Sequence, residues 1–326
     1  ASAGTLLEVR QLSVHFPLPG RAERVRAVDQ VSLEVQAGET LALVGESGCG
    51  KSTLARAIAG LVAPTAGQVR FEGQELGVLG TRARRSYCRK LQMVFQDPDA
   101  SLDPRRTIGA AVAEALELHR AAPRAAQLER VGELFESVGL DRALEGRYPH
   151  ELSGGQKQRV CIARALAPEP RLLICDEAVS ALDVSIQAQI LNLLAELKGR
   201  FGLSYLFITH DLRVVRHIAD RVAVMYLGEL VELAPAQALF DAPQHPYTRA
   251  LLAAVPHIGA GRGAAASVLS GEVPSPANPP SGCRFHPRCP SRMPRCANEA
   301  PPLYRLEGRS ARCFLVEPDA ANVPSA

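Results

Sequence analysis

The chain has 326 residues, of which 47% are hydrophobic and 22% charged, and its formal net charge is +3. This length allows one large core or two smaller ones, and the interspersed charges argue against a concentrated basic surface for nucleic acid. The sequence has no run of about 18 uncharged apolar residues, the length that a membrane span needs. Residues 1–10 lack the pattern of a signal peptide. A role at a membrane would therefore depend on partner proteins.

Strands and helices are predicted to alternate along the first 250 residues. Apolar and polar residues alternate in the first strand, and a polar turn at 20–26 follows it. The predicted strands are 5–16, a segment near 31–35, 39–44, 171–175 and 204–209. The predicted helices lie at 52–59, within 107–144 and at 186–197. This alternation predicts an α/β core.

A glycine-rich loop separates the strand at 39–44 from the helix at 52–59. Residues 45–52 read GESGCGKS and match the phosphate-loop pattern G-x-x-x-x-G-K-[ST] in full. Glycines allow backbone N–H groups to approach a phosphate, and a helix N-terminus adds partial positive charge. Lys51 is expected to reach the β- and γ-phosphates, and the Ser52 hydroxyl is expected to bind Mg²⁺. The residues predicted to bind ATP here are Gly45, Ser47, Gly48, Cys49, Gly50, Lys51, Ser52 and Thr53.

Two carboxylates follow the predicted strand at 171–175. Asp176 is placed to bind Mg²⁺ at the end of this strand. Glu177, one position further, is placed to polarise a water for attack on the γ-phosphate. An Asp-Glu pair after a strand is also typical of a helix N-cap. Its combination with the phosphate loop favours nucleotide hydrolysis.

Residues 152–156 read LSGGQ and precede a helix of small and apolar residues. This pentapeptide resembles the signature sequence of ABC ATPases. The resemblance implies that the signature of one subunit closes over the γ-phosphate held by its neighbour, so that two ATP molecules lie in a head-to-tail dimer. The signature residues expected to bind ATP in this way are Ser153, Gly154, Gly155 and Gln156.

Three further elements of this family follow in the expected order. Gln96, in VFQD at 94–97, matches the loop that senses Mg²⁺ and the attacking water and that links to the membrane subunits. Asp183, in SALD at 180–183, matches the loop at the dimer interface. His210, after the strand at 204–209, matches the switch histidine at the γ-phosphate. The resemblance thus adds Gln96 and His210 to Glu177 as catalytic residues, with Gln96 also at Mg²⁺.

Two positions fit the family pattern less closely. Phe16, at the end of the first predicted strand, fits the aromatic residue that stacks on adenine; a core position for Phe16 is the alternative, with Val25 or Arg26 at the base. Ala178 occupies the place after the Asp-Glu pair where transporters of this kind usually carry proline. Because proline there stiffens a turn, we expect a change in backbone entropy and unchanged chemistry.

The resemblance covers residues 5–256 and implies an ABC-type core, RecA-like, with an antiparallel β subdomain and a helical subdomain at about 97–165. We predict an ATP-binding domain at 1–255 and a C-terminal extension at 256–326. Only 102 positions separate Lys51 from Ser153, too few for the coiled coil of DNA-repair ABC ATPases. A non-transport ABC ATPase acting on nucleic acid or ribosomes, and an iron–sulfur assembly ATPase, remain the alternatives.

The tail resembles the C-terminal extension of oligopeptide/dipeptide permease ATPases. The resemblance lies in QHPYTRALL at 244–252, VPSP at 273–276 and PPSGC at 279–283, and SLDPR at 101–105 resembles the F-type member. It implies a paralogous D-type ATPase as heterodimer partner, two transmembrane permease subunits and an extracytoplasmic peptide-binding protein, with no nucleic-acid partner. The chain would then lie at the cytoplasmic face of the cell membrane. Nickel importers share much of this pattern and are the alternative for the cargo.

Four of the eight cysteines lie in the tail, with the spacing C-x5-C-x6-C-x16-C. This spacing lacks the C-x2–4-C pairs usual in structural zinc sites. Together with the permease resemblance, it favours a 4Fe–4S cluster, and zinc or unliganded thiols are the alternatives. The predicted ligands are Cys283, Cys289, Cys296 and Cys313. Neighbouring arginines would offset the negative charge of a cluster or form a solvated face; they are Arg284, Arg288, Arg292 and Arg295.

Overall fold

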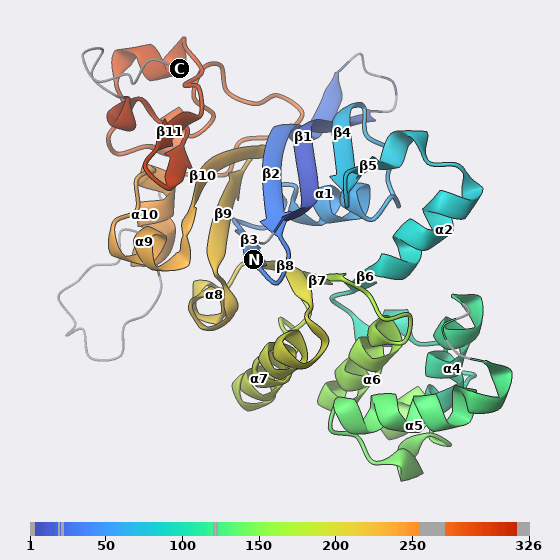
Figure 1. The fold of residues 1–326 in the computed structure, drawn as a ribbon. Coiled ribbons are helices and arrows are strands. Elements are labelled where there is room, and N and C mark those ends of the chain that lie inside the picture. The colour runs from blue at the N-terminus through green and yellow to red at the C-terminus, as the bar shows by residue number, and fades with distance from the viewer. Residues whose placement is uncertain are drawn as a thin grey trace.

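A computed structural model describes residues 4–317 apart from 19, 21, 22, 120, 122 and 255–270. These residues form two β-sheets with helices packed around them, a helical region at one end and the C-terminal segment at the other (Figure 1). The observed architecture is the predicted α/β class. The predicted domain boundary at 255/256 lies outside the described residues.

The larger sheet contains eight strands in the order β11-β12-β10-β9-β3-β8-β7-β6. The five strands from β9 to β6 run parallel, whereas β10, β12 and β11 add antiparallel pairs at one edge. Every residue of β3, β7 and β8 is buried, which is the reason these strands are continuous apolar runs in the sequence. The strands are β3 (Thr40–Val44), β6 (Leu91–Val94), β7 (Leu172–Asp176), β8 (Ser204–Thr209), β9 (Arg221–Tyr226), β10 (Glu229–Pro235), β11 (Tyr304–Leu306) and β12 (Arg309–Ala311).

The smaller sheet is antiparallel, in the order β2-β1-β4-β5. Its strands are β1 (Thr5–Pro17), β2 (Arg24–Gln36), β4 (Ala66–Phe71) and β5 (Gln74–Glu75). β2 begins well before the predicted segment at 31–35, because its pairing with β1 continues to the Pro17–Arg24 pair. Residues 24–26, which the sequence pattern assigns to a turn, therefore belong to a strand because they pair with β1. The apolar face of this sheet shares a core with β3 and α1.

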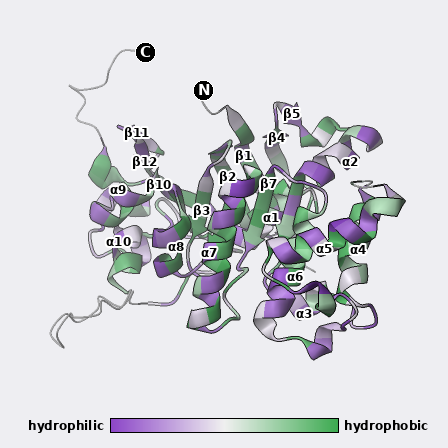
Figure 2. Cartoon of the chain, turned by 60° about the horizontal axis from the view of Figure 1, so that its bottom comes forward, coloured by the Kyte–Doolittle hydropathy of each residue, from purple (hydrophilic) through white to green (hydrophobic). Residues whose placement is uncertain are grey.

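Four helices pack near the sheets, and four others form the helical region. The first group is α1 (Lys51–Ile58), α2 (Thr81–Lys90), α7 (Val184–Phe201) and α8 (Leu212–Ile218). The second group is α3 (Pro98–Ser101), α4 (Ile108–Leu118), α5 (Gln127–Ser137) and α6 (Gly154–Leu166). This group lies to one side of the sheet (Figure 1). The predicted helical stretch at 107–144 is two helices, α4 and α5, and Pro123 lies in their connection. In Figure 2, hydrophobic and hydrophilic residues alternate around α7, as expected for a helix packed against a core.

The C-terminal segment adds strands to the larger sheet. It begins after α9 (Ala236–Asp241) and α10 (Pro246–Ala253), and β12 pairs with β10 through Glu232–Ala311 and Leu233–Ser310. Phe285 packs with Tyr226 and Tyr247 in one buried cluster. The segment therefore shares both a sheet and a core with the preceding residues. The short 3-10 helices of the described chain are η1 (Leu76–Val78), η2 (Arg124–Ala126), η3 (Arg142–Leu144), η4 (Pro149–Glu151), η5 (His286–Arg288), η6 (Pro294–Ala297) and η7 (Phe314–Val316).

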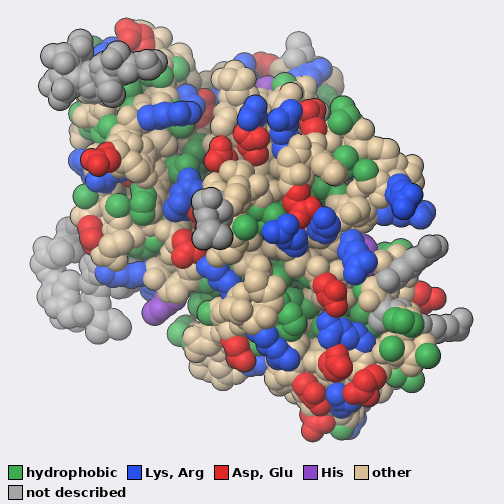
Figure 3. Space-filling model, viewed as in Figure 1, with side chains coloured by type: hydrophobic (Ala, Val, Ile, Leu, Met, Phe, Trp, Pro, Cys, Tyr) green, Lys and Arg blue, Asp and Glu red, His purple; other side chains and the backbone are tan. Residues whose placement is uncertain are grey.

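Among the described residues, no helix combines the length and apolar character that crossing a bilayer requires. On the face shown in Figure 3, acidic and basic side chains are interspersed over the sheets and the helical region.

Candidate ATP-binding and hydrolysis site

Parallel strand register brings the predicted site residues to one edge of the larger sheet. Val44 at the end of β3 pairs with Thr209 at the end of β8, and Asp176 at the end of β7 pairs with Ile208. Val94 at the end of β6 pairs with Cys175. The carboxyl ends of β3, β6, β7 and β8 are therefore aligned, which is where ligands bind in open α/β sheets.

The phosphate loop runs from β3 into α1, and close backbone approaches require two of its three glycines. A Cβ at Gly45 would lie 2.2 Å from the Met225 carbonyl oxygen, and a Cβ at Gly50 would lie 1.9 Å from that of Ala27. Gly50 also has φ of 103°, in the left-handed region. The Lys51 ammonium is buried and donates to the Gly45 oxygen at 2.8 Å. The loop thus presents its lysine at the start of a helix, as an anion site requires.

The predicted Mg²⁺ ligands Ser52 and Asp176 are in direct contact. The Ser52 hydroxyl donates to Asp176 Oδ1 at 2.9 Å, although 124 positions separate the two residues. Burial raises the pKa of Asp176, and the hydrogen bond from Ser52 opposes that shift. A hydroxyl and a carboxylate side by side are oxygen ligands of the kind that Mg²⁺ prefers. The residues present therefore fit this cation.

Gln96, Glu177 and His210 converge at the ends of three neighbouring strands. Gln96 Nε2 donates to Glu177 Oε2 at 3.2 Å, and His210 Nδ1 lies 3.4 Å from Glu177 Oε1. Glu177 has φ of 49°, a conformation that is rare for a residue with a side chain. Ala178, which follows Glu177, is buried. The three predicted catalytic side chains thus form one cluster around the Glu177 carboxylate.

The remaining predicted residues of the phosphate loop and base site have the following positions. Ser47 and Gly48 are exposed on the loop, and Thr53 is partly buried in α1. Cys49 is buried beneath the loop, and burial raises the pKa of its thiol. Phe16 lies one residue before the end of β1, opposite Val25, and is 40% exposed, so it is not a core residue. Its stacking on adenine stays a prediction.

The LSGGQ motif begins α6 and stabilises its own helix terminus. Ser153 Oγ accepts from the Gln156 N–H at 3.3 Å, and Gln156 Oε1 accepts from the Ser153 N–H at 3.0 Å. This reciprocal arrangement is a capping box. Gly154 and Gly155 form the first turn, and a Cβ at Gly155 would lie 2.6 Å from the Ile186 side chain. In the described part of the chain, no hydrogen bond or ion pair joins this motif to the phosphate loop.

Asp183 caps α7 and accepts hydrogen bonds from the N–H groups of Ser185 and Ile186. Backbone hydrogen bonding to Ile186 lowers the pKa of Asp183. Its side chain is exposed, so it is available to a second subunit. The interface role stays a prediction.

The four tail cysteines line one small apolar cavity. Cys283, Cys289, Cys296 and Cys313 share this cavity with Phe285 and Phe314. Burial raises the pKa of Cys283 to about 12. Within the described residues, no three His, Cys, Asp or Glu side chains are grouped closely enough to hold a single metal ion. The shared cavity places the four cysteines near one another, and the 4Fe–4S cluster stays a prediction.

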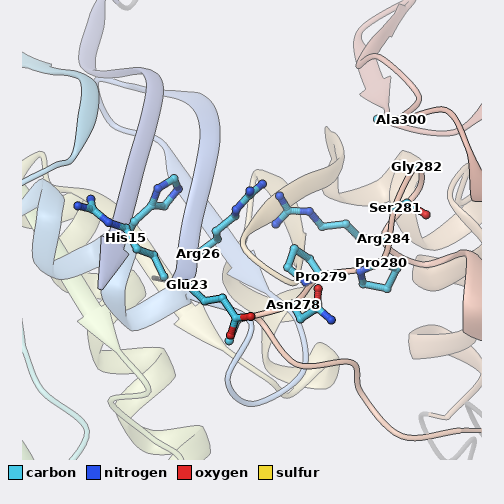
Figure 4. A pocket seen from close by; sticks show the side chains of 12 residues that line it. His15, Glu23, Arg26, Asn278, Pro279, Pro280, Ser281, Gly282, Arg284 and Ala300 are labelled. Carbon is cyan, nitrogen blue, oxygen red and sulfur yellow. The ribbon is translucent and has the colours of Figure 1, made fainter. Parts of the chain in front are cut away.

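Three of the four arginines beside these cysteines are paired with carboxylates. Arg284 contacts Asp29 and Glu229, and Arg295 contacts Glu317. Arg284 and Arg26 point toward one another across the cavity between the β1–β2 hairpin and the C-terminal segment (Figure 4). Arg288 pairs with Glu46 of the phosphate loop. Sequence reasoning missed this last contact, because no local motif relates residues 242 positions apart.

A phosphate loop, an acidic strand end and an LSGGQ-capped helix on one α/β sheet define an ABC-type ATPase. Residues 28–180 match the family model "ABC transporter", and residues 231–296 match "Oligopeptide/dipeptide transporter, C-terminal region". The chain belongs to the family of ATP-binding subunits of oligopeptide/dipeptide ABC transporters. ATP hydrolysis is therefore its activity.

Relatives resemble nearly the whole chain. The probable peptide ABC transporter ATP-binding protein y4tS of Sinorhizobium fredii is 52% identical over 97% of this chain and 91% of its own length. The oligopeptide transport ATP-binding protein AppF of Bacillus subtilis is 51% identical over 92% of this chain and 94% of its own. The di/tripeptide transport ATP-binding protein DppF of Pseudomonas aeruginosa is 48% identical over 96% and 98%.

Two solved structures share the fold. One is cbiO1 of Clostridium perfringens, part of the ABC transporter complex cbiONQ, with 27% identity and a TM-score of 0.65 over 73% of this chain and 91% of that one. The other is the ATP-binding cassette MJ0796, a dimer in a post-hydrolysis state with ADP and Pi. It has 29% identity and a TM-score of 0.64 over 71% of this chain and 99% of its own.

Proposed function

We propose that this chain hydrolyses ATP to drive the import of di- or oligopeptides through partner membrane subunits. The observation that carries the proposal is the combination of the contacts of Gln96 and His210 with Glu177 and a C-terminal segment that matches the oligopeptide/dipeptide transporter region. The names of AppF and DppF, which describe oligopeptide and di/tripeptide transport, support the cargo class. They also support the F-type assignment.

Each catalytic residue has a distinct role in this proposal. Lys51 and the backbone N–H groups of the loop stabilise the phosphates of ATP. Glu177 accepts a proton from the attacking water. Gln96 and His210 lie at the two oxygens of the Glu177 carboxylate and orient this carboxylate. His210 also contacts the γ-phosphate. Positioning of this kind supplies most of the catalysis in phosphoryl transfer to water.

Mg²⁺ would be held by Ser52, Asp176 and Gln96. When bound, it neutralises charge on the phosphate oxygens. The Ser52–Asp176 contact holds both oxygen ligands side by side before the cation arrives. Asp176 therefore needs little rearrangement when Mg²⁺ binds. Its burial disfavours the charged carboxylate until a cation is present.

A second subunit would complete the site. The LSGGQ motif has no described contact with the phosphate loop of its own chain, and its helix N-terminus is suited to an anion held by a neighbour. The dimeric state named for MJ0796 supports this arrangement. We assign the partner to a paralogous D-type ATPase, with Asp183 at the interface. Two transmembrane permease subunits and an extracytoplasmic peptide-binding protein complete the transporter, which places this chain at the cytoplasmic face of the membrane.

The chain divides into an ATP-binding domain and a C-terminal extension in this proposal. We assign the ATP-binding domain to residues 1–255, with a helical subdomain at about 97–165, and the extension to residues 256–326. The match to the C-terminal region begins at residue 231, within β10, and β12 pairs with this strand. The extension would therefore act as a continuation of the ATPase sheet.

The tail cysteines would hold a 4Fe–4S cluster, with zinc as the alternative. Their convergence on one cavity supports a common ligand, and the spacing in the sequence disfavours a zinc knuckle. A bound cluster would supply order to a segment with few strands of its own. Chain purified without oxygen should contain iron and absorb near 400 nm, and a Cys283→Ser/Cys296→Ser variant should lose both. Zinc in place of iron, or no metal at all, would refute the cluster.

Reconstituted transport tests the cargo. Proteoliposomes containing this chain with its permease subunits, partner ATPase and binding protein should take up labelled di- or oligopeptides only with ATP. A Lys51→Ala variant in the same preparation should abolish uptake. Nickel uptake without peptide uptake would support the alternative importer, and no transport of either would reject the importer function.

A further inference from the structure

Glu46, the second residue of the phosphate loop, is held by two residues from far along the chain. Its backbone N–H donates to Tyr247 Oη at 2.8 Å. Its carboxylate accepts two hydrogen bonds from Arg288, at 2.7 and 3.0 Å. Tyr247 and Arg288 lie 201 and 242 positions later in the sequence. The position of Glu46 in the loop therefore depends on contacts with the C-terminal part of the chain.

Arg288 is held in this position by its surroundings. It is 8% exposed and is the last residue of η5, which begins after Phe285. Its guanidinium also lies 3.4 Å from Tyr226 Oη and over the Tyr226 ring. A buried guanidinium costs desolvation, so it requires a paired acceptor. The two parallel hydrogen bonds to Glu46 are the geometry that arginine, and not lysine, provides.

Glu46 links this pair to the lysine of the phosphate loop. The Glu46 carbonyl oxygen accepts from Lys51 Nζ at 3.0 Å and from the Cys49 N–H at 3.3 Å. Its backbone N, backbone O and side chain thus all have partners. Displacement of Glu46 would move the carbonyl that positions the Lys51 ammonium, and a loop that is less well ordered binds its ligand less tightly.

We propose that Arg288, assisted by Tyr247, is a positioning residue for ATP binding, which acts through Glu46 and does not touch the nucleotide. The inference rests on ATP binding at residues 45–52, as proposed above. It gives the C-terminal segment a direct part in the ATPase, whereas a segment that served only membrane partners or a metal would leave the phosphate loop unaffected.

A double-mutant cycle on the full chain tests this inference, with the Kd for MgATP as the readout. Arg288→Gln and Glu46→Gln should each raise the Kd about tenfold, because each breaks a bidentate charged pair that orders the loop. The double variant should bind no more weakly than either single variant. Arg288→Lys, which keeps the charge and loses the second hydrogen bond, should give an intermediate Kd.

Arg295→Gln is the matched control, because Arg295 belongs to the same segment but pairs with Glu317 inside it. Its Kd for MgATP should equal that of the wild type. Effects of Arg288→Gln and Glu46→Gln that multiply in the double variant would overturn the inference, and so would wild-type affinity in either. Should Arg288→Gln not fold, Glu46→Gln alone decides, since Glu46 is only partly buried.

Failure of the proposed ATP site is distinguishable from failure of this inference. If the wild type binds MgATP and Lys51→Ala does not, the site stands, and the Arg288 variants test the positioning role alone. If Lys51→Ala binds ATP as the wild type does, the site itself is elsewhere.

Discussion

The side-chain amide of Gln96 donates to the carboxylate of Glu177 at 3.2 Å, which joins the end of β6 to the end of β7 across 81 positions of sequence. His210, at the end of β8, lies 3.4 Å from the other carboxylate oxygen. Glu177 is thus held from both sides in a backbone conformation with φ of 49°. An acceptor restrained in this way is suited to a water placed in line with a phosphate.

Replacement of Glu177 by Gln should preserve MgATP affinity and lower the turnover of ATP by about 10²–10⁴-fold, the usual contribution of a general base. The amide keeps the shape of the side chain, and the loop around Lys51 is untouched. Single-turnover hydrolysis and equilibrium binding of MgATP measure the two effects separately. Undiminished hydrolysis in Glu177→Gln would remove this residue from the mechanism.

Replacement of Ser153 by Ala should lower ATPase turnover beyond what the lost helix cap explains. Ser153 Oγ caps α6, so its removal should cost about 1 kcal/mol of unfolding free energy. Thr107→Ala is the matched control, because Thr107 caps α4 with a hydrogen bond of the same 3.3 Å length. Both variants should lose similar stability in urea, and only Ser153→Ala should lose hydrolysis in the assembled transporter. Equal turnover in the two would confine Ser153 to the cap.

Replacement of Gly50 by Ala should destabilise the fold by about 2–4 kcal/mol, the range expected for an unrelieved clash in a strained backbone. The added Cβ would lie 1.9 Å from the Ala27 carbonyl oxygen of β2. Gly38→Ala provides the comparison, since Gly38 also has positive φ but an added Cβ meets nothing within 4 Å. It should cost about 1 kcal/mol, from backbone conformation alone. Denaturant midpoints measure both, and equal losses would contradict the close approach at Gly50.

Stability should fall in mild acid because of His245. Burial lowers the pKa of His245 to about 3, from 6.5, so the unfolded state binds a proton below pH 6.5 that the folded state does not. This difference should cost about 2 kcal/mol at pH 5 relative to pH 7.5 and about 1.4 kcal/mol for each further pH unit down to the folded pKa. The ring also caps α10, accepting from the Tyr247 N–H at 3.0 Å.

His245→Asn separates the two roles, because the Asn side-chain oxygen can accept the same cap hydrogen bond but does not titrate. The variant should lose this part of the acid dependence between pH 7.5 and 5. Urea unfolding at a series of pH values measures the slope. An unchanged slope would assign the acid sensitivity to other groups.

The strands and helices that the sequence predicts well are those whose pattern is set by their own burial. β8 coincides with the predicted 204–209, and α7 contains the predicted 186–197, because apolar runs and helical periodicity reflect a buried environment directly. The start of β2 lies outside the predicted segment, since residues 24–30 mix charged and apolar residues and are held in the sheet by pairing with β1. The pairing of β12 with β10 could likewise not be predicted from the sequence, because it depends on where the C-terminal segment packs against the edge of the sheet.

The sequence by itself determined the chemistry of this ATPase, because the phosphate loop at 45–52 and the helix cap at 153–156 are local arrangements in which residue type and spacing suffice. Only the tertiary structure decided which distant groups meet. The contacts of Gln96 with Glu177, of Ser52 with Asp176 and of Arg288 with Glu46 follow from strand order and from the packing of the C-terminal segment against the sheet. Such pairings are set by the burial of whole surfaces, which no single stretch of sequence encodes.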